Sequence, residues 1–442
     1  MTVAIVRNAN PERNAGPARA RMNRVVCVVF AIGGWAYLAS LCSSLLALRP
    51  PAAGFDLQLL LDAAGRVASG GSPYDQNAVA SGLSARDLFY SYPPLVAQAL
   101  VPVSGLPGWL VLAGSWIGAI VGLAVVAAAV ARSSIGRHTV APISLLATID
   151  AALLTVAAAA FFLPLAVGVL FGNIDMFFPL LFGAVAVAAV GGPVSSRATT
   201  ILGGAALAVA SAIKLHPASL GLWLLVRATR PNDPARGSML RVVLAAVGIG
   251  TGILVVSFIV GGIGPWRTYV EYLGLTSNAD LATRVNIGPA SQVALLLGNN
   301  GLAHQLAFVS TGVALLVTVA SARLVRDPLE AITWATIASL IILPVTWYHY
   351  PVALLPMALA AWLRSRNTVG SRGVAAALIA AYLVADLAIA LPVLLWVAVA
   401  LLLVAIRRST DVAGVVPAEA AAALLPGAVS RPTQPAVPTA NP

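Results

Sequence analysis

Long runs of apolar residues alternate with short polar segments along most of this chain. A helix needs about 20 apolar residues to cross a bilayer, and lipid admits only helices or closed barrels as spanning structures. We therefore predict an all-α, polytopic integral membrane protein. The apolar runs cover residues 24–47, 92–131, 141–171, 174–190, 198–228, 238–261, 302–322, 328–363 and 373–406.

Several runs are too long for a single crossing and carry proline or polar residues near their middle. We divide three of them, 198–228, 328–363 and 373–406, into two helices each, which gives about twelve transmembrane helices by the length rule. The run 92–131 is also long, and Pro102 and Pro107 indicate a short or re-entrant helix before its main span. The path of that run stays open.

Composition supports the membrane class. Hydrophobic residues make up 60% of the chain and charged residues 9%, with a mean hydropathy of +0.92. An ordinary soluble domain has roughly 25% charged residues. No basic soluble module is long enough for nucleic-acid binding. Cys27 and Cys42 both fall in the first apolar run, which leaves no disulfide framework or zinc spacing, and we expect neither a metal nor a cofactor.

The arginines predict the orientation, because positive residues in short loops stay cytoplasmic. Residues 1–23 are arginine-rich and are placed in the cytoplasm, as is an Ala/Pro-rich tail over 407–442 that we expect to be disordered. Counting alternate crossings places the other arginine clusters on the same side, provided that 92–131 crosses an odd number of times. The net charge of +11 is accounted for by these segments. The scarcity of lysine beside arginine and alanine suggests a GC-rich bacterium and its plasma membrane.

Two long loops, Arg49 to Ser91 and Gly262 to Gly301, map to the outer side. In the first, Leu57 to Val67 has apolar residues at helical spacing, which suits an interfacial helix. Three membrane segments also end there with polar residues near their tips: Asn173-Ile174-Asp175, Lys214-Leu215-His216-Pro217 and Thr346-Trp347-Tyr348-His349-Tyr350.

Lys214 is the only lysine of the 442 residues and lies in the apolar run 201–226. An isolated charge at bilayer depth costs about 2.5 to 3.5 kcal/mol on insertion scales, so this residue indicates a functional site. Pro217 disfavours continued helix at His216, which places the Lys-x-His pair at a helix break near the outer surface.

Several short motifs follow one another along the chain: Phe55-Asp56-Leu57, Gly70-Gly71-Ser72-Pro73-Tyr74, Tyr92-Pro93-Pro94-Leu95, Gly172-Asn173, Ala212 to Pro217, Asn286 to Ser291 and Pro344 to His349. Their order resembles glycosyltransferase family 87, whose members are membrane enzymes of the GT-C superfold. The resemblance covers about residues 24 to 365 and implies a GT-C catalytic domain within residues 24–406. It also implies transfer of mannose, or in some members arabinofuranose, from a polyprenyl-phosphate donor to an envelope lipid or glycan acceptor on the extracytoplasmic side.

In such enzymes an aspartate at the start of the first outer loop is the catalytic base, and that position matches Asp56. A carboxylate can accept the proton of an attacking hydroxyl, and a fixed cation eases departure of a phosphate. We assign Asp56 as base and Lys214, His216 and Arg267 to the donor phosphate, with inversion at the anomeric carbon. The remaining candidates for substrate contact are Tyr92, Asn173, Asp175, Arg284, Asn286, Tyr348 and His349.

Each candidate also has a plain structural alternative. Asp56 could be an exposed carboxylate or a helix cap, with Asp62 and Asp75 as rivals, and Lys214 could be a snorkelling side chain. The arginines could be solvated, and the tyrosines could belong to an interfacial aromatic belt. A secondary transporter or lipid-sugar flippase is the rival function, and a membrane scaffold is a third. In the transporter, the ion or proton path would consist of Asp150, Asp175, Lys214 and Asp386.

Overall fold

The computed structural model describes residues 12–48, 51–75, 90–133, 135, 144–191, 196–276, 281–366 and 370–411, and its regular elements within these ranges are all helices. The predicted all-α class is confirmed. The first half comprises α1 (Glu12–Leu46), α2 (Phe55–Ala68), α4 (Pro94–Leu100), η1 (Val101–Val103), α5 (Gly108–Arg132), α6 (Leu145–Phe161), α7 (Leu163–Phe171), η3 (Ile174–Phe177), α8 (Phe178–Val190) and α9 (Arg197–Ile213).

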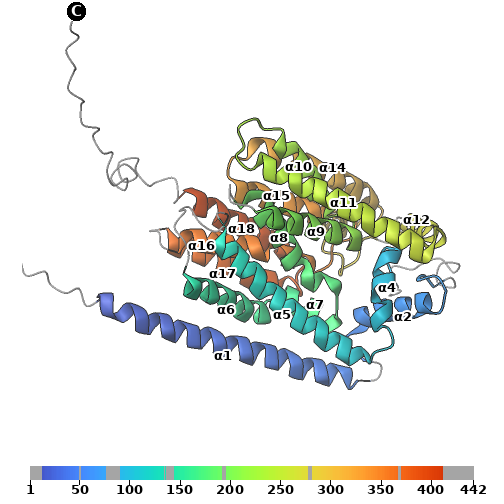
Figure 1. The fold of residues 1–442 in the computed structure, drawn as a ribbon, viewed down its shortest axis with the longest axis horizontal. Helices are drawn as coiled ribbons and strands as arrows, with labels where there is room; N and C mark the ends of the chain where they lie inside the picture. Colours follow the sequence, from blue (N-terminus) through green and yellow to red (C-terminus); the bar gives the residue numbers. More distant parts are fainter. Residues whose placement is uncertain are drawn as a thin grey trace, which may run out of the picture.

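The second half continues the same helical architecture to the end of the described chain (Figure 1). The tail predicted to be disordered covers residues 407–442. Residues 407–411 instead continue α18, which corrects the predicted boundary, and residues 412–442 lie outside the described residues. The elements are α10 (Ala218–Ala228), α11 (Arg236–Gly261), α12 (Gly264–Thr276), α13 (Pro289–Leu296), α14 (Leu302–Leu324), α15 (Pro328–Ile341), η4 (Tyr350–Leu354), α16 (Leu355–Ser365), α17 (Ser371–Leu387) and α18 (Leu394–Asp411).

Four described helices are long and apolar enough to cross a membrane alone: Arg21–Leu46 of α1, α5, α11 and α14. The pair α6 and α7, bent by 74° at its junction, would make a fifth span. The prediction of about twelve spans is not confirmed, because many apolar runs are divided into short helices. For example, α9 has 17 residues. At 1.5 Å per residue it reaches about 26 Å, less than the roughly 30 Å of the hydrocarbon core.

The observed breaks between helices agree with those predicted from the sequence. The three divided runs are interrupted at 214–217, 342–349 and 388–393, and Pro217 directly precedes α10. The run 92–131 contains α4, then η1 with Pro102, and then α5, which starts after Pro107. Leu57 to Val67 lies within α2, whose buried side includes Leu57, Leu60 and Leu61. Proline and apolar spacing therefore placed these boundaries correctly.

The core centres on α8, where Phe178 and Phe182 are almost fully buried. Small residues let its neighbours approach closely. A side chain at Gly183 would overlap Val126 of α5, and one at Gly203 of α9 would overlap Ala188 of α8. Close backbone approach at glycine is typical of helix packing inside membranes.

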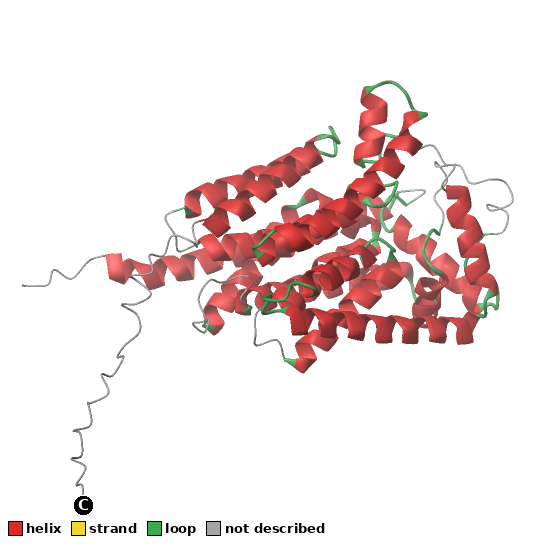
Figure 2. Ribbon diagram, turned by 90° about the horizontal axis from the view of Figure 1, so that it is seen from above, coloured by secondary structure: helices red, strands yellow, loops and turns green. Residues whose placement is uncertain are grey.

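The two ends of the molecule contain different helices. Figure 1 shows α2, α4 and α12 at one end, with the start of α1 and the end of α18 toward the other. Viewed from above, most of the helices run lengthwise between these ends (Figure 2). Three arginine–aspartate ion pairs join segments away from α2: Arg24–Asp150 at 2.6 Å, Arg227–Asp233 at 3.1 Å and Arg364–Asp327 at 2.9 Å.

Candidate active site

Asp56 lies in the first turn of α2, at the end of the molecule that α4 and α12 share. Gly54 adopts a φ of 71° just before the helix, and its N–H donates to the Leu170 carbonyl of α7 at 2.8 Å. The half-buried Asp56 carboxylate accepts a hydrogen bond of 2.7 Å from Nδ2 of Asn173. The Gly54 backbone and the Asp56 side chain therefore both connect the start of α2 to the segment at the end of α7.

Gly172 makes this approach possible. It ends α7 with a φ of 69°, and a Cβ there would lie 2.7 Å from Cβ of Leu57. Only glycine satisfies both the left-handed backbone and the close contact. The next residue, Asn173, caps η3 by accepting from the Asp175 N–H at 2.9 Å while its amide donates to Asp56. Asn173 therefore both caps η3 and holds the Asp56 carboxylate.

Asp175 is fully buried and joins two basic side chains from distant segments. Its Oδ2 lies 2.6 Å from Nζ of Lys214 and 3.1 Å from Nε2 of His349. A buried carboxylate needs such partners, because an uncompensated charge in an apolar interior costs several kcal/mol. The three polar breaks that the sequence placed on one side therefore meet at a single oxygen atom.

Lys214 follows α9 in an extended conformation, and α10 begins only after Pro217. Its ammonium lies 4.1 Å from the ring centre of Tyr350, 5.7 Å from that of Tyr92 and 6.0 Å from that of Phe178. Cations within about 6 Å of an aromatic face are attracted by the ring quadrupole. The ammonium is thus held by one carboxylate and surrounded by rings, so the snorkelling alternative does not describe it.

His216 packs beside this group, stacked on Tyr350 with ring centres 5.6 Å apart and 15° between the planes. Its ring is buried, and neither ring nitrogen has a hydrogen-bond partner among the described residues; the same holds for Oδ1 of Asp175. Buried polar atoms are normally satisfied by protein, water or ligand. The unsatisfied atoms of His216 and Asp175 lie within the group of side chains around Lys214.

The environment of Asp56 also sets its protonation. Burial raises the pKa of Asp56 above the ordinary carboxyl value, whereas the Asn173 hydrogen bond and the nearby His349 and Lys214 lower it. A carboxylate with a raised pKa is a better proton acceptor than an exposed one. Its rival on the same helix, Asp62, is exposed and accepts a hydrogen bond of 2.7 Å from Gln58.

Four predicted site residues lie elsewhere. Arg267 of α12 and Arg284 are exposed. Asn286 is buried and holds its own loop: its Nδ2 donates to the Leu281 and Pro344 carbonyls, each at 3.0 Å. The Tyr348 hydroxyl donates to the Ala385 carbonyl of α17 at 2.9 Å. Asn286 and Tyr348 thus brace the loops around the cluster.

Sequence reasoning did not single out Tyr350 and Phe178. Tyr350 stood in the quoted polar break, next to His349, but its contact with Lys214 depends on two segments more than 130 residues apart. Phe178 belongs to an ordinary apolar run and carried no signal. Among the described residues no three His, Cys, Asp or Glu side chains form a group that could hold a metal ion.

The four charges of the rival ion path do not all lie together. Lys214 and Asp175 are in contact at 2.6 Å, whereas Asp150 pairs with Arg24. Asp386 accepts a hydrogen bond of 2.8 Å from the Leu163 N–H at the bend between α6 and α7. Asp150 and Leu163 are 13 positions apart along a mostly helical segment, which corresponds to about 20 Å. Asp150 and Asp386 therefore lie apart from each other, and each has its own partner.

The described residues define the class of the protein: an all-helical, polytopic membrane protein with a buried cluster of carboxylate, lysine and histidine side chains. The family model of glycosyltransferase family 87 matches residues 90–347, more than half of the chain. The chain belongs to this family and is a membrane glycosyltransferase. The match includes Asn173, Asp175 and Lys214, whereas Asp56 and His349 lie outside it. A search of curated proteins finds none that matches.

Proposed function

We propose that this protein transfers a sugar, mannose as the first candidate, from a polyprenyl-phosphate donor to an envelope lipid or glycan acceptor with inversion at the anomeric carbon. The observation that carries the proposal is that one segment positions both a half-buried carboxylate and an ammonium. Asn173 donates to Asp56, and Asp175, two residues later, pairs with Lys214. A transferase of this kind needs both groups, one for the acceptor and one for the leaving phosphate.

Asp56 serves as the base. Its carboxylate takes the proton of the acceptor hydroxyl as the hydroxyl oxygen attacks the anomeric carbon of the donor. The bond between that carbon and the phosphate oxygen breaks, and the electron pair leaves with the phosphate. The donor phosphodiester carries one negative charge and the departing monoester carries two, which balances the proton on Asp56. A single displacement inverts the configuration, so a β-linked donor gives an α-linked product.

Lys214 stabilises the charge that develops on the phosphate. Asp175 fixes one side of its ammonium at 2.6 Å, and the Tyr350 ring faces it at 4.1 Å. An ammonium has three N–H donors, so donors remain for a phosphate. Preorganised donors of this kind stabilise developing charge without reorganisation. His216 and His349 stand next to it as further donors.

We place the reaction on the extracytoplasmic face, with both termini cytoplasmic. Support comes from the arginine-rich segments, which lie between apolar runs on the side opposite the polar breaks. The grouping of α2, α4 and α12 at the end away from the start of α1 agrees with that assignment.

The direct test assays purified protein with polyprenyl-phosphate mannose and, separately, polyprenyl-phosphate arabinofuranose against envelope lipids. We expect a glycosidic product from one donor, with inverted anomeric configuration by NMR. Product from neither donor would contradict the proposed substrate class. Labelled sugar that crosses proteoliposomes without formation of a glycosidic bond would favour the flippase alternative.

A further inference from the structure

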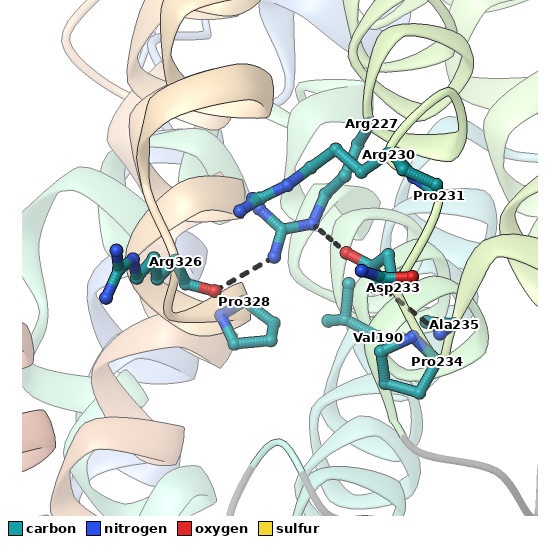
Figure 3. A pocket seen from close by; sticks show the side chains of 10 residues that line it. Val190, Arg227, Arg230, Pro231, Asp233, Pro234, Ala235, Arg326 and Pro328 are labelled. Atoms are coloured by element: carbon teal, nitrogen blue, oxygen red, sulfur yellow. Dashed lines mark hydrogen bonds and ion pairs between the residues drawn. The ribbon is translucent and has the colours of Figure 1, made fainter.

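A cavity of about 650 Å³ lies at the end of α10 that is farther from Lys214. Its walls come from the connection between α10 and α11, the connection into α15 and the end of α8 (Figure 3). The 11 residues of α10 separate it from Pro217 by about 16 Å. This cavity is therefore distinct from the candidate active site.

Arg227 forms the floor of the cavity. Its side chain is only 2% exposed, and its Nε lies 3.1 Å from Oδ2 of Asp233. Its Nη1 and Nη2 donate to the carbonyls of Val325 and Arg326, each at 3.0 Å. One guanidinium thus joins the two connections that face each other across the cavity and fixes their spacing.

Arg230 lies above this floor and makes fewer hydrogen bonds to the protein than Arg227 does. Its Nη1 donates to the Val325 carbonyl at 2.9 Å. A guanidinium carries five N–H donors, so a ligand can still be bound through the others. Arg326 lines the cavity as well, and Figure 3 shows its side chain directed away from Arg227. It adds to the positive field at the exposed edge.

The charges around the cavity do not cancel. Three arginines line it, against one carboxylate, Asp233, which Arg227 already engages. Asp327, which directly follows Arg326, accepts from Arg364 through both oxygens, at 3.1 and 2.9 Å. The cavity therefore offers surplus positive charge that suits an anion, and guanidinium forks match phosphate geometry.

Apolar groups complete the cavity and point to the source of the phosphate. Prolines 231, 234 and 328 line it beside Val190. Along α11, which starts at the cavity, Leu240 is 38% exposed and Leu244 is 70% exposed. A phospholipid could lay its acyl chains on these leucines with its headgroup in the cavity. We propose that this cavity binds the phosphate of an anionic phospholipid, with Arg230 as the main contact.

The test measures equilibrium binding of fluorescent short-chain phosphatidylglycerol to the full-length protein in neutral detergent, beside phosphatidylcholine of the same chain length. We expect saturable binding of the anionic lipid alone, weakened about tenfold or more by Arg230→Gln, since a charged hydrogen bond is lost. Arg407→Gln makes the same charge change at an exposed position on α18, outside the cavity, and should leave binding unchanged.

Equal binding of the two lipids, or equal loss in Arg407→Gln, would overturn the proposal, because either result describes a diffuse surface charge. Displacement of the lipid by inorganic phosphate at matching concentration would overturn the lipid assignment and favour a soluble phosphate compound. Arg230→Lys keeps the charge without the fork and should bind more tightly than Arg230→Gln. Thermal unfolding without lipid checks that both variants fold.

Discussion

The side-chain amide of Asn173 and the start of α2, rather than a second carboxylic acid, position the carboxylate of Asp56. If it is the base, Asp56→Asn keeps the shape but removes the proton acceptor. We expect kcat to fall about 10²- to 10⁴-fold, the usual contribution of general base catalysis. The matched control is Asp62→Asn, because Asp62 lies on the exposed side of the same helix. Equal rates for wild type and Asp56→Asn would remove Asp56 from the mechanism.

Asn173→Ala should move the acid limb of the pH profile of kcat/KM to higher pH. Burial raises the pKa of Asp56, and the hydrogen bond from Asn173 opposes this because it stabilises the carboxylate. Without that bond the pKa of Asp56 rises further, so the proton-accepting form is populated only at higher pH. A charged hydrogen bond of about 1.5 to 3 kcal/mol corresponds to about one to two pH units. A lower plateau with an unmoved limb would assign Asn173 to the fold alone.

A substitution of Lys214 alone would change catalysis and stability together. It leaves the buried Asp175 carboxylate without the ammonium that lies 2.6 Å from it. We expect Lys214→Met to lose about 3 to 5 kcal/mol of stability, as when one partner of a buried pair is deleted. The double variant Lys214→Met with Asp175→Asn should recover most of it. In steady-state kinetics the double variant should still show a lowered kcat and a lowered kcat/KM for the donor, with a nearly unchanged KM for the acceptor. Recovery of donor use would make the pair structural.

At the scale of residues, the sequence predicts which side chains carry the chemistry better than it predicts which side chains contact one another. A single lysine in an apolar run and a proline directly after His216 indicate the candidate site without any structure. The joint contact of Lys214 and His349 with Asp175 could not be predicted, because it depends on how three helix breaks pack. Tyr350 was missed for the same reason: an aromatic residue near a membrane surface is ordinary until its ring faces a buried ammonium.

At the scale of elements, the contact of α2 with the end of α7 decides whether Asp56 reaches the cluster. Gly172→Ala should displace α2, since the new Cβ would lie 2.7 Å from Leu57 and the backbone φ is 69°. We expect a loss of about 1 to 3 kcal/mol in stability and a larger proportional loss of transfer activity. The control is Gly114→Ala within α5, where nothing lies within 4 Å of an added Cβ. Unchanged transfer in Gly172→Ala would show that the contact is dispensable.

Helix boundaries were predictable where proline sets them, as at Pro107 and Pro217. The number of full spans was not, because run length in the sequence counts apolar residues whether or not the helix is continuous. The run 141–171 shows this: it is long enough to cross once, yet it bends by 74° after Phe161. Packing of the bend against α17, through Asp386 and the Leu163 N–H, is a tertiary effect that periodicity does not report.

For the whole molecule, the orientation of the site relative to the membrane is the property on which the proposed donor depends, because it decides which lipid-linked sugars can reach Asp56. Figure 1 shows α2 and the end of α18 toward different ends of the molecule. The exposed Asp62 belongs to α2, and the exposed Arg407 belongs to the last turns of α18. With Cys27 and Cys42 replaced by serine, Asp62→Cys should react with a membrane-impermeant maleimide in intact cells. Arg407→Cys should react only after permeabilisation, since the positive-inside rule puts it in the cytoplasm. The reverse pattern would place the catalytic cluster on the cytoplasmic side, where nucleotide sugars rather than outward-facing lipid-linked sugars are available, and would contradict the proposed donor class while leaving the contacts of Asp175 intact.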